Sequence, residues 1–180
     1  GDNVASYYYL VATLPTLRLD GPLSFSTDTF LGLCKPLVSE HHYRLLCKAL
    51  SGEPSSHPFL KAYQHFASMV NKELVEQRSR KLSLSDPVYR NDGDKEGRIS
   101  DIVRQALAQD NVLEAEMLLL ALHWKFLDEL ATLHTFDIEA LLGFALKLKL
   151  LQRKSLFTRE EGNAEFKRLF SNIQTEIANN

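Results

Sequence analysis

The stretch that most constrains the fold of this chain is NVLEAEMLLLALHWKFLDELATLH, residues 111–134. Between Val112 and Ala131 the apolar side chains fall on nearly every side of a helix with 3.6 residues per turn. In a soluble chain, a helix that is apolar on most sides has to be covered by other helices. Asn111, followed three positions later by Glu114, resembles a capping box and predicts where this helix begins.

The polar residues of this helix separate into two sets. One set shares a narrow face that we predict to face solvent: Glu114, Lys125, Asp128 and Glu129. Glu116 and His123 fall on the opposite, apolar side, where a buried carboxylate needs a partner. Two interpretations stay open. Glu116 forms a structural contact with an Arg or Lys of a neighbouring helix, or Glu116 and His123 form a pair that transfers protons. Seven residues separate Glu116 and His123, so their backbone positions lie about 10 Å apart along the helix axis, and the spacing does not by itself indicate a pair.

A second helix is predicted directly afterwards, over FDIEALLGFALKLKLLQR at 136–153, with Thr135 or Asp137 as its cap. Acidic residues open this helix and basic residues close it, which is the arrangement that the helix dipole favours. The basic residues at its end are Lys147, Lys149, Arg153 and Lys154. They form either a solvated helix end or a docking patch for an acidic protein surface.

Shorter signals divide the first half of the chain. YYYLVATL at 7–14 has strand propensity, but it also fits a short helix that stops before Pro15. Ser26 or Thr27 is expected to cap a helix through Leu33.

Further helices complete the predicted set. The first begins after Ser39 and ends at Gly52, and a long helix begins at Pro58. Residues 83–97 contain turn formers and little to bury, so they predict a flexible loop before a helix near 98–109. A capping box at Thr158 and Glu161 predicts a last helix with an apolar stripe, formed by Phe166, Leu169, Phe170, Ile173 and Ile177. We therefore expect an all-α, compact bundle of about seven helices, folded as a single domain over residues 1–180.

Composition and motifs exclude several classes of function. The net charge is only −2, and the basic run at Arg78, Arg80 and Lys81 lacks interleaved aromatic residues, so no nucleic-acid partner is expected. No apolar run approaches the length of about 20 residues that spans a membrane. No phosphate-binding loop, dinucleotide fingerprint or hydrolase motif occurs.

The cysteines and histidines do not form a zinc motif. The possible ligands Cys34, His41, His42 and Cys47 follow no usual zinc spacing, and two cysteines suit a reducing compartment. The sequence therefore predicts a non-enzymatic protein without metal or cofactor, which works by contact with other proteins.

The central stretch also resembles a family of uncharacterised bacterial proteins encoded beside V-type ATP synthase subunits. The resemblance lies in FLDEL at 126–130, in HTFDIEALLGFALKLKLLQR at 134–153, and in the N-terminal YYYLVATLPTL at 7–17. Phe157, Gly162 and Phe166 also fit, whereas Gly143 departs from the family pattern, which has a larger residue there.

This resemblance implies a role like that of the C-type connector subunit of these enzymes, whose helical bundles would be related in fold. The chain would be a non-catalytic component or assembly factor of a bacterial V-type ATPase. It would connect the soluble rotor to the membrane ring, on the cytoplasmic side of the inner membrane and without a membrane span of its own. The expected contacts are the basic residues at 147–154 together with Arg78, Arg80 and Lys81. An unrelated helical adaptor or regulator is the alternative.

Overall fold

The computed structural model describes residues 4–23, 25–83, 97–134 and 137–158. These residues form seven α-helices and no strand, which confirms the all-α class. They divide into two compact units. The first contains the described residues of 1–63 and 124–156, and the second contains those of 64–123 and 157–180. The single domain stays a prediction, and the predicted last helix and most of the predicted loop lie outside the described residues.

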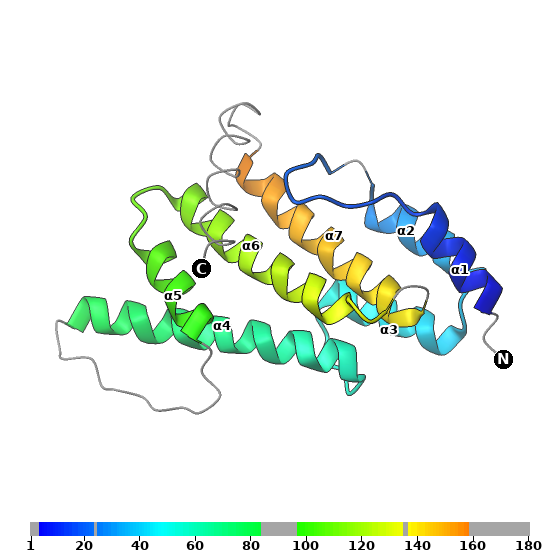
Figure 1. The fold of residues 1–180 in the computed structure, drawn as a ribbon, viewed down its shortest axis with the longest axis horizontal. Helices are drawn as coiled ribbons and strands as arrows, with labels where there is room; N and C mark the ends of the chain where they lie inside the picture. Colours follow the sequence, from blue (N-terminus) through cyan, green and yellow to red (C-terminus); the bar gives the residue numbers. More distant parts are fainter. Residues whose placement is uncertain (1–3, 24, 84–96, 135–136, 159–180) are drawn as a thin grey trace. The chain divides into compact units, whose positions relative to one another are not determined.

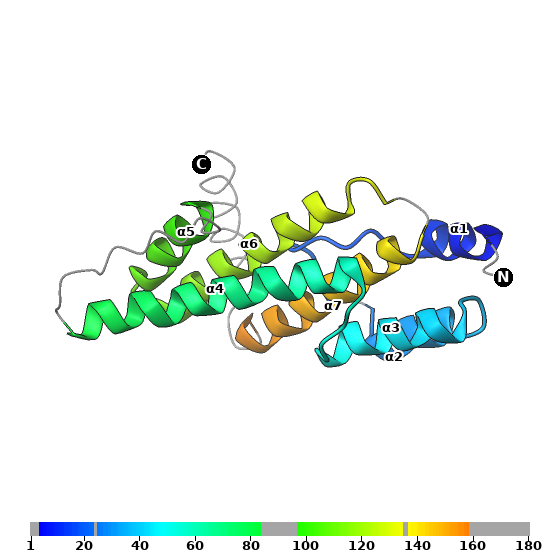
Figure 2. The ribbon, with the colours of Figure 1, turned by 90° about the horizontal axis from the view of Figure 1, so that it is seen from below.

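The first unit is built from α1 (Val4–Thr13), α2 (Thr27–Cys34), α3 (Glu40–Ser51), the start of α4 (Pro58–Ser83), the end of α6 (Val112–Ala131) and α7 (Ile138–Thr158). Helices α2 and α3 are in contact with each other. They overlap in the view of Figure 2, and the order of the helices along the chain can be followed in Figure 1.

The predicted caps of α2 and α3 are confirmed. The Ser26 hydroxyl accepts a hydrogen bond from the Thr29 amide at 3.0 Å, and the Ser39 hydroxyl accepts one from the His42 amide at 3.1 Å. Gly52 ends α3 in the left-handed region with φ 81°, a conformation that favours glycine because it has no Cβ.

Residues 4–13 are helical, so the strand alternative for the N-terminal segment is wrong and the short helix before Pro15 is confirmed. The tertiary contacts explain why strand propensity does not decide here. Tyr7 and Leu10 are buried, and the Tyr7 hydroxyl bonds to Nδ1 of His42 on α3. One face of α1 is thereby fixed on the unit, while Tyr8 and Tyr9 stay exposed.

The central helices largely follow the prediction. Trp124 is 9% exposed and Leu127 is fully buried, as expected for a helix that is apolar on most sides. Leu119, which belongs to the same apolar stretch, is only half-buried. Asn111 accepts a hydrogen bond from the Leu113 amide through its side chain at 2.8 Å, which places the cap of α6 where the sequence predicts it.

Helix α7 provides much of the core of the first unit. Its buried residues include Leu141, Leu142, Leu148 and Leu151. A Cβ atom placed on Gly143 would lie 3.5 Å from the Phe59 ring and 3.8 Å from the Ala131 methyl group. An alanine would therefore fit in ordinary contact, whereas the larger residue of the family pattern would need those neighbours to move.

The second unit contains the remainder of α4, α5 (Gly97–Leu107) and the start of α6. Helix α5 lies beside the later part of α4 and at an angle to it (Figure 2). Two hydrogen bonds join them. The side-chain amide of Gln77 donates to the Ser100 carbonyl at 3.0 Å, and the Lys81 ammonium donates to the Leu107 carbonyl at 3.1 Å. Within the described part of the chain, every helix is too short or too polar to traverse a lipid bilayer.

Candidate functional site

Lys154, predicted as an exposed docking residue, is buried at 6% exposure. Its ammonium group donates to the backbone carbonyl of Leu19 at 2.7 Å and to that of Gly21 at 2.5 Å. Burial lowers the pKa of Lys154, and the nearby Asp20 carboxylate opposes that shift. The prediction of exposure is therefore wrong, because this lysine holds the loop before α2 against α7.

Lys147 and Lys149 are both partly buried. The Lys147 ammonium pairs with the Asp128 carboxylate and lies 5.0 Å from the centroid of the Trp124 ring, a cation–π arrangement. The Lys149 ammonium lies next to Gly52 at the end of α3, and burial lowers its pKa. Lys147 thus joins α7 to α6, Lys149 lies beside the end of α3, and Arg153 is the exposed member of the predicted basic end.

In the second unit, Arg78 and Lys81 are exposed on α4, as predicted. Arg80 is not fully exposed: its guanidinium lies 3.7 Å from the Glu73 carboxylate and 3.9 Å from the Glu76 carboxylate. The pair of Glu76 and Arg80 is the one expected from their spacing of four residues. Of the seven predicted contact residues, Arg78, Lys81 and Arg153 keep their charge at the surface.

Glu73 is a buried carboxylate that the sequence analysis missed. It is 5% exposed, and its Oε1 accepts hydrogen bonds from the side-chain amide of Gln77 at 2.8 Å and from the Ser100 hydroxyl at 3.3 Å. An open pocket of about 220 Å³ lies beside its hydrogen-bond partners Gln77 and Ser100. The pocket is lined by Gln77, Arg80, Ser100 and Arg104. The only signal in the sequence was a glutamate on the apolar side of α4.

Glu116 and His123 are half-buried on α6, so they are less buried than their place on its apolar side predicts. The His123 ring meets the Phe66 ring edge-on at 5.3 Å between centroids. The predicted solvent face is only partly correct, since Asp128 and Glu129 are exposed while Glu114 and Lys125 are half-buried.

Metal-ligand side chains gather at the bend before α7. Within the described ranges, one group of three such residues has its donor atoms within 4.8 Å of one another: His134, Asp137 and Glu139. We call these three residues the acid–histidine cluster. Nδ1 of His134 lies 3.0 Å from Oδ2 of Asp137 and 3.9 Å from Oε2 of Glu139. The sequence analysis did not identify the cluster, although His, Asp and Glu within six residues at a predicted bend was an available signal.

Electrostatics at this cluster favour the ionised carboxylate of Asp137. Burial alone would raise the pKa of Asp137, but the hydrogen bonds from His134 and from the Ala140 amide outweigh it, so the pKa lies below its usual value. The Ala140 bond, 3.2 Å to Oδ1, also confirms Asp137 as the cap of α7. Thr135, the alternative cap, lies outside the described residues.

The cysteine–histidine set of the sequence analysis, Cys34, His41, His42 and Cys47, is separate from the acid–histidine cluster. Cys34 is fully buried on α2, and burial raises the pKa of its thiol to about 12. A thiol held in that state is a poor nucleophile, because the thiolate is the reactive form.

Fold and sites together define an all-α protein with buried charges that join its helices and a small group of acidic and histidine side chains at one helix start. The chain belongs to the family described as Protein of unknown function (DUF2764), whose model matches residues 63–177. No curated protein matches the chain. No solved structure matches it either.

Proposed function

We propose that this protein is a non-catalytic component or assembly factor of a bacterial V-type ATPase, in a role like that of its C-type connector subunit between the soluble rotor and the membrane ring. The observation that carries the proposal is the resemblance of the segments at 7–17 and 126–153 to proteins encoded with that ATPase. These segments correspond to α1, the loop after it, the end of α6 and most of α7.

The side chains available for such contact are exposed ones. On α1, Tyr8 and Tyr9 are 55% and 60% exposed, and tyrosine is enriched at protein interfaces. On α4, Arg78 and Lys81 present positive charge that would suit an acidic surface of the partner. On α7, Arg153 does the same. These exposed groups support a function carried out by contact, with the complex providing the attachment to the membrane.

The test is recovery of the ATPase from native membranes by the full-length protein, followed by mass spectrometry. Wild type should recover the catalytic or rotor subunits. The double variant Arg78→Glu with Lys81→Glu should recover roughly tenfold less at low salt and lose less at high salt, because exposed charges are screened within about 8–10 Å. Lys61→Glu with Lys72→Glu is the matched control, since it makes the same charge change at exposed positions of the same helix.

Two outcomes separate the alternatives. Equal recovery by both double variants would remove Arg78 and Lys81 from the contact. Failure of wild type to recover any ATPase subunit would refute the proposed function and favour the unrelated helical adaptor or regulator. Since the sequence has no phosphate-binding loop, we also expect no binding of ATP at micromolar nucleotide in isothermal titration calorimetry.

A further inference from the structure

The three possible donor atoms of the acid–histidine cluster lie close together. The two carboxylates that provide two of them also contact groups outside the cluster. Asp137 uses Oδ1 to cap α7 at the Ala140 amide and turns Oδ2 toward His134. Glu139 has Oε1 3.8 Å from Nε2 of His57 and Oε2 3.9 Å from Nδ1 of His134. Each carboxylate therefore has one oxygen near an outer partner and the other near the centre.

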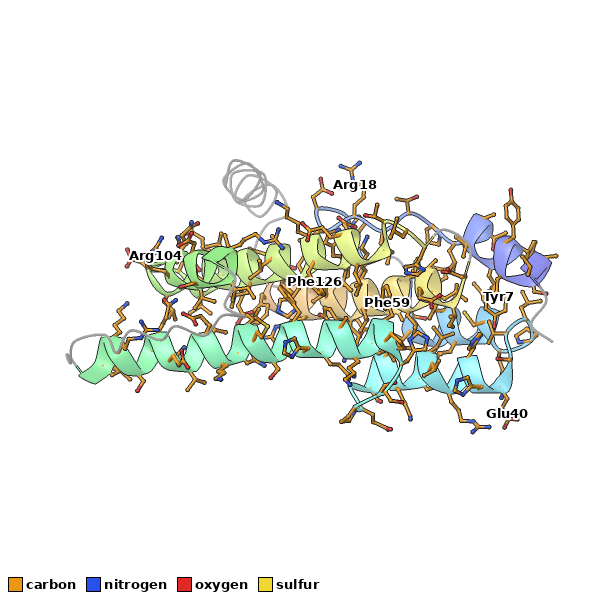
Figure 3. All side chains as sticks on the ribbon, turned by 60° about the horizontal axis from the view of Figure 1, so that its bottom comes forward. Tyr7, Arg18, Glu40, Phe59, Arg104 and Phe126 are labelled. Atoms are coloured by element: carbon orange, nitrogen blue, oxygen red, sulfur yellow. The ribbon has the colours of Figure 1, made fainter. Side chains whose placement is uncertain are left out.

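The ring of His134 is positioned as well. It meets the Phe59 ring edge-on, with 6.1 Å between centroids, and Phe59 lies on the first turn of α4 (Figure 3). The imidazole is thus packed against an aromatic side chain with Nδ1 directed to the two carboxylates. All of these residues belong to the first unit.

His57 has a fixed tautomer in this arrangement. Its Nδ1 accepts a hydrogen bond from the Phe59 amide at 3.3 Å at the start of α4, so in the neutral ring the proton is on Nε2. Nε2 is the atom that faces Glu139. A histidine N–H beside a carboxylate oxygen is the pattern that orients metal ligands in many proteins.

The separations suit a small divalent ion. Bonds of about 2.0–2.2 Å from zinc to nitrogen and oxygen put neighbouring tetrahedral donors roughly 3.3–3.6 Å apart. The two distances from Nδ1 of His134, 3.0 Å to Asp137 and 3.9 Å to Glu139, bracket that range. All three donor atoms lie within 4.8 Å of one another, so side-chain rotations of about 1 Å would bring them onto one ion. Two carboxylates supply two negative charges, and an imidazole with carboxylates suits zinc and similar transition metals.

We propose that the acid–histidine cluster binds one divalent transition-metal ion such as Zn²⁺ through Nδ1 of His134, Oδ2 of Asp137 and Oε2 of Glu139. On binding, the proton that Nδ1 of His134 donates to Asp137 is released to solvent, and the neutral ring then carries its proton on Nε2. His57 is a positioning residue that holds Glu139. The bound ion would attach His134 to the start of α7, with water completing the coordination. The positive end of the α7 dipole opposes a cation only weakly compared with two adjacent carboxylates. This inference does not depend on the proposed ATPase role.

The test measures Zn²⁺ binding to the full chain, free of any histidine tag, by equilibrium dialysis and isothermal titration calorimetry. Asp137→Asn and Glu139→Gln each remove one charge and keep the shape, and asparagine is as good a helix cap as aspartate. We expect one Zn²⁺ per chain at this site, and at least tenfold weaker binding in each variant. His57→Asn keeps a capping side chain at the start of α4 and should weaken Zn²⁺ binding by about tenfold, as loss of an orienting partner does.

Two controls make the result specific. His65→Ala and Glu40→Gln alter the same residue types at exposed positions, and both should bind Zn²⁺ as wild type does. Far-UV circular dichroism establishes that each variant is folded, and Glu139→Gln gives the answer if Asp137→Asn fails to fold. Wild type that binds no Zn²⁺, or that binds it no more tightly than Glu139→Gln does, would overturn the proposal. The cluster would then be an ion-pair network that only caps α7.

Discussion

Replacing Lys154 with methionine tests the most consequential departure from the predicted surface. Methionine keeps an unbranched side chain of similar length and removes the ammonium group. The carbonyls of Leu19 and Gly21 then lose their donors, which lie at 2.7 Å and 2.5 Å in wild type. Because the side chain is buried, water has little access to replace those bonds.

The magnitude follows from two opposing effects. A hydrogen bond to a charged group contributes about 1.5–3 kcal/mol to stability, and two such bonds are lost. Removing a buried charge also removes its desolvation penalty, the effect that lowers the pKa of Lys154. We therefore expect a net loss of about 2–4 kcal/mol in the free energy of unfolding, since the loss of the bonds exceeds the relief. For a chain of this size each kcal/mol shifts the melting temperature by about 2–4 °C, so Tm should fall by roughly 4–16 °C.

Urea denaturation followed by circular dichroism measures the change, and Arg153→Met is the matched control. Arg153 is the exposed neighbour on α7, so its replacement should alter the free energy of unfolding by less than about 1 kcal/mol. If Lys154→Met proved as stable as wild type, or more stable, desolvation of the ammonium would outweigh its two hydrogen bonds. The account of Lys154 as a stabilising link between α7 and the loop before α2 would then be refuted.

Three further predictions concern the packing of the chain. Leu127→Ala should lower the free energy of unfolding by about 2–5 kcal/mol, and Leu119→Ala should lower it clearly less, because Leu127 is fully buried and Leu119 is half-buried. Equal losses in urea denaturation would contradict this. Gly52→Ala should cost about 1–2 kcal/mol by the same assay, because φ is 81° there, and no loss would mean that the turn relaxes. A thiol reagent at pH 8 should label Cys47 before Cys34, whose burial raises its pKa to about 12 and leaves only about 1 part in 10⁴ as thiolate, and early labelling of Cys34 by mass spectrometry would contradict its burial.

Features encoded locally were predictable from the sequence. The caps at Ser26 and Ser39 depend on a side chain and a backbone amide three residues away, and the end of α3 depends on the conformational freedom of Gly52. The burial of Trp124 followed from a helix with apolar residues on most sides. Each of these inferences uses only residues that are neighbours along the chain.

Features that depend on distant partners were not predictable in the same way. Lys154 looked like a favourable charge at a helix end, whereas its acceptors are carbonyls more than 130 residues away in sequence. Strand propensity at 7–14 could not anticipate the contact between Tyr7 and His42 that accompanies the helix. The acid–histidine cluster lies within one short stretch of sequence, but the approach of His57 to Glu139 became visible only in three dimensions.

The charges that join distant parts of each unit also decide how partner binding can be tested. In the first unit Lys154 connects α7 with a loop, and in the second unit Glu73 connects α4 with Ser100 of α5. Reversing either charge would leave buried polar groups without partners and destabilise the unit, so a loss of association in such a variant would report unfolding. Arg78 and Lys81 are exposed, so reversing their charge mainly changes the surface. Lys81→Glu also removes the hydrogen bond to the Leu107 carbonyl of α5, so circular dichroism and urea denaturation have to show that the double variant is as stable as the control. A loss of association that appears at these two positions, and weakens with added salt, therefore reports the contact itself.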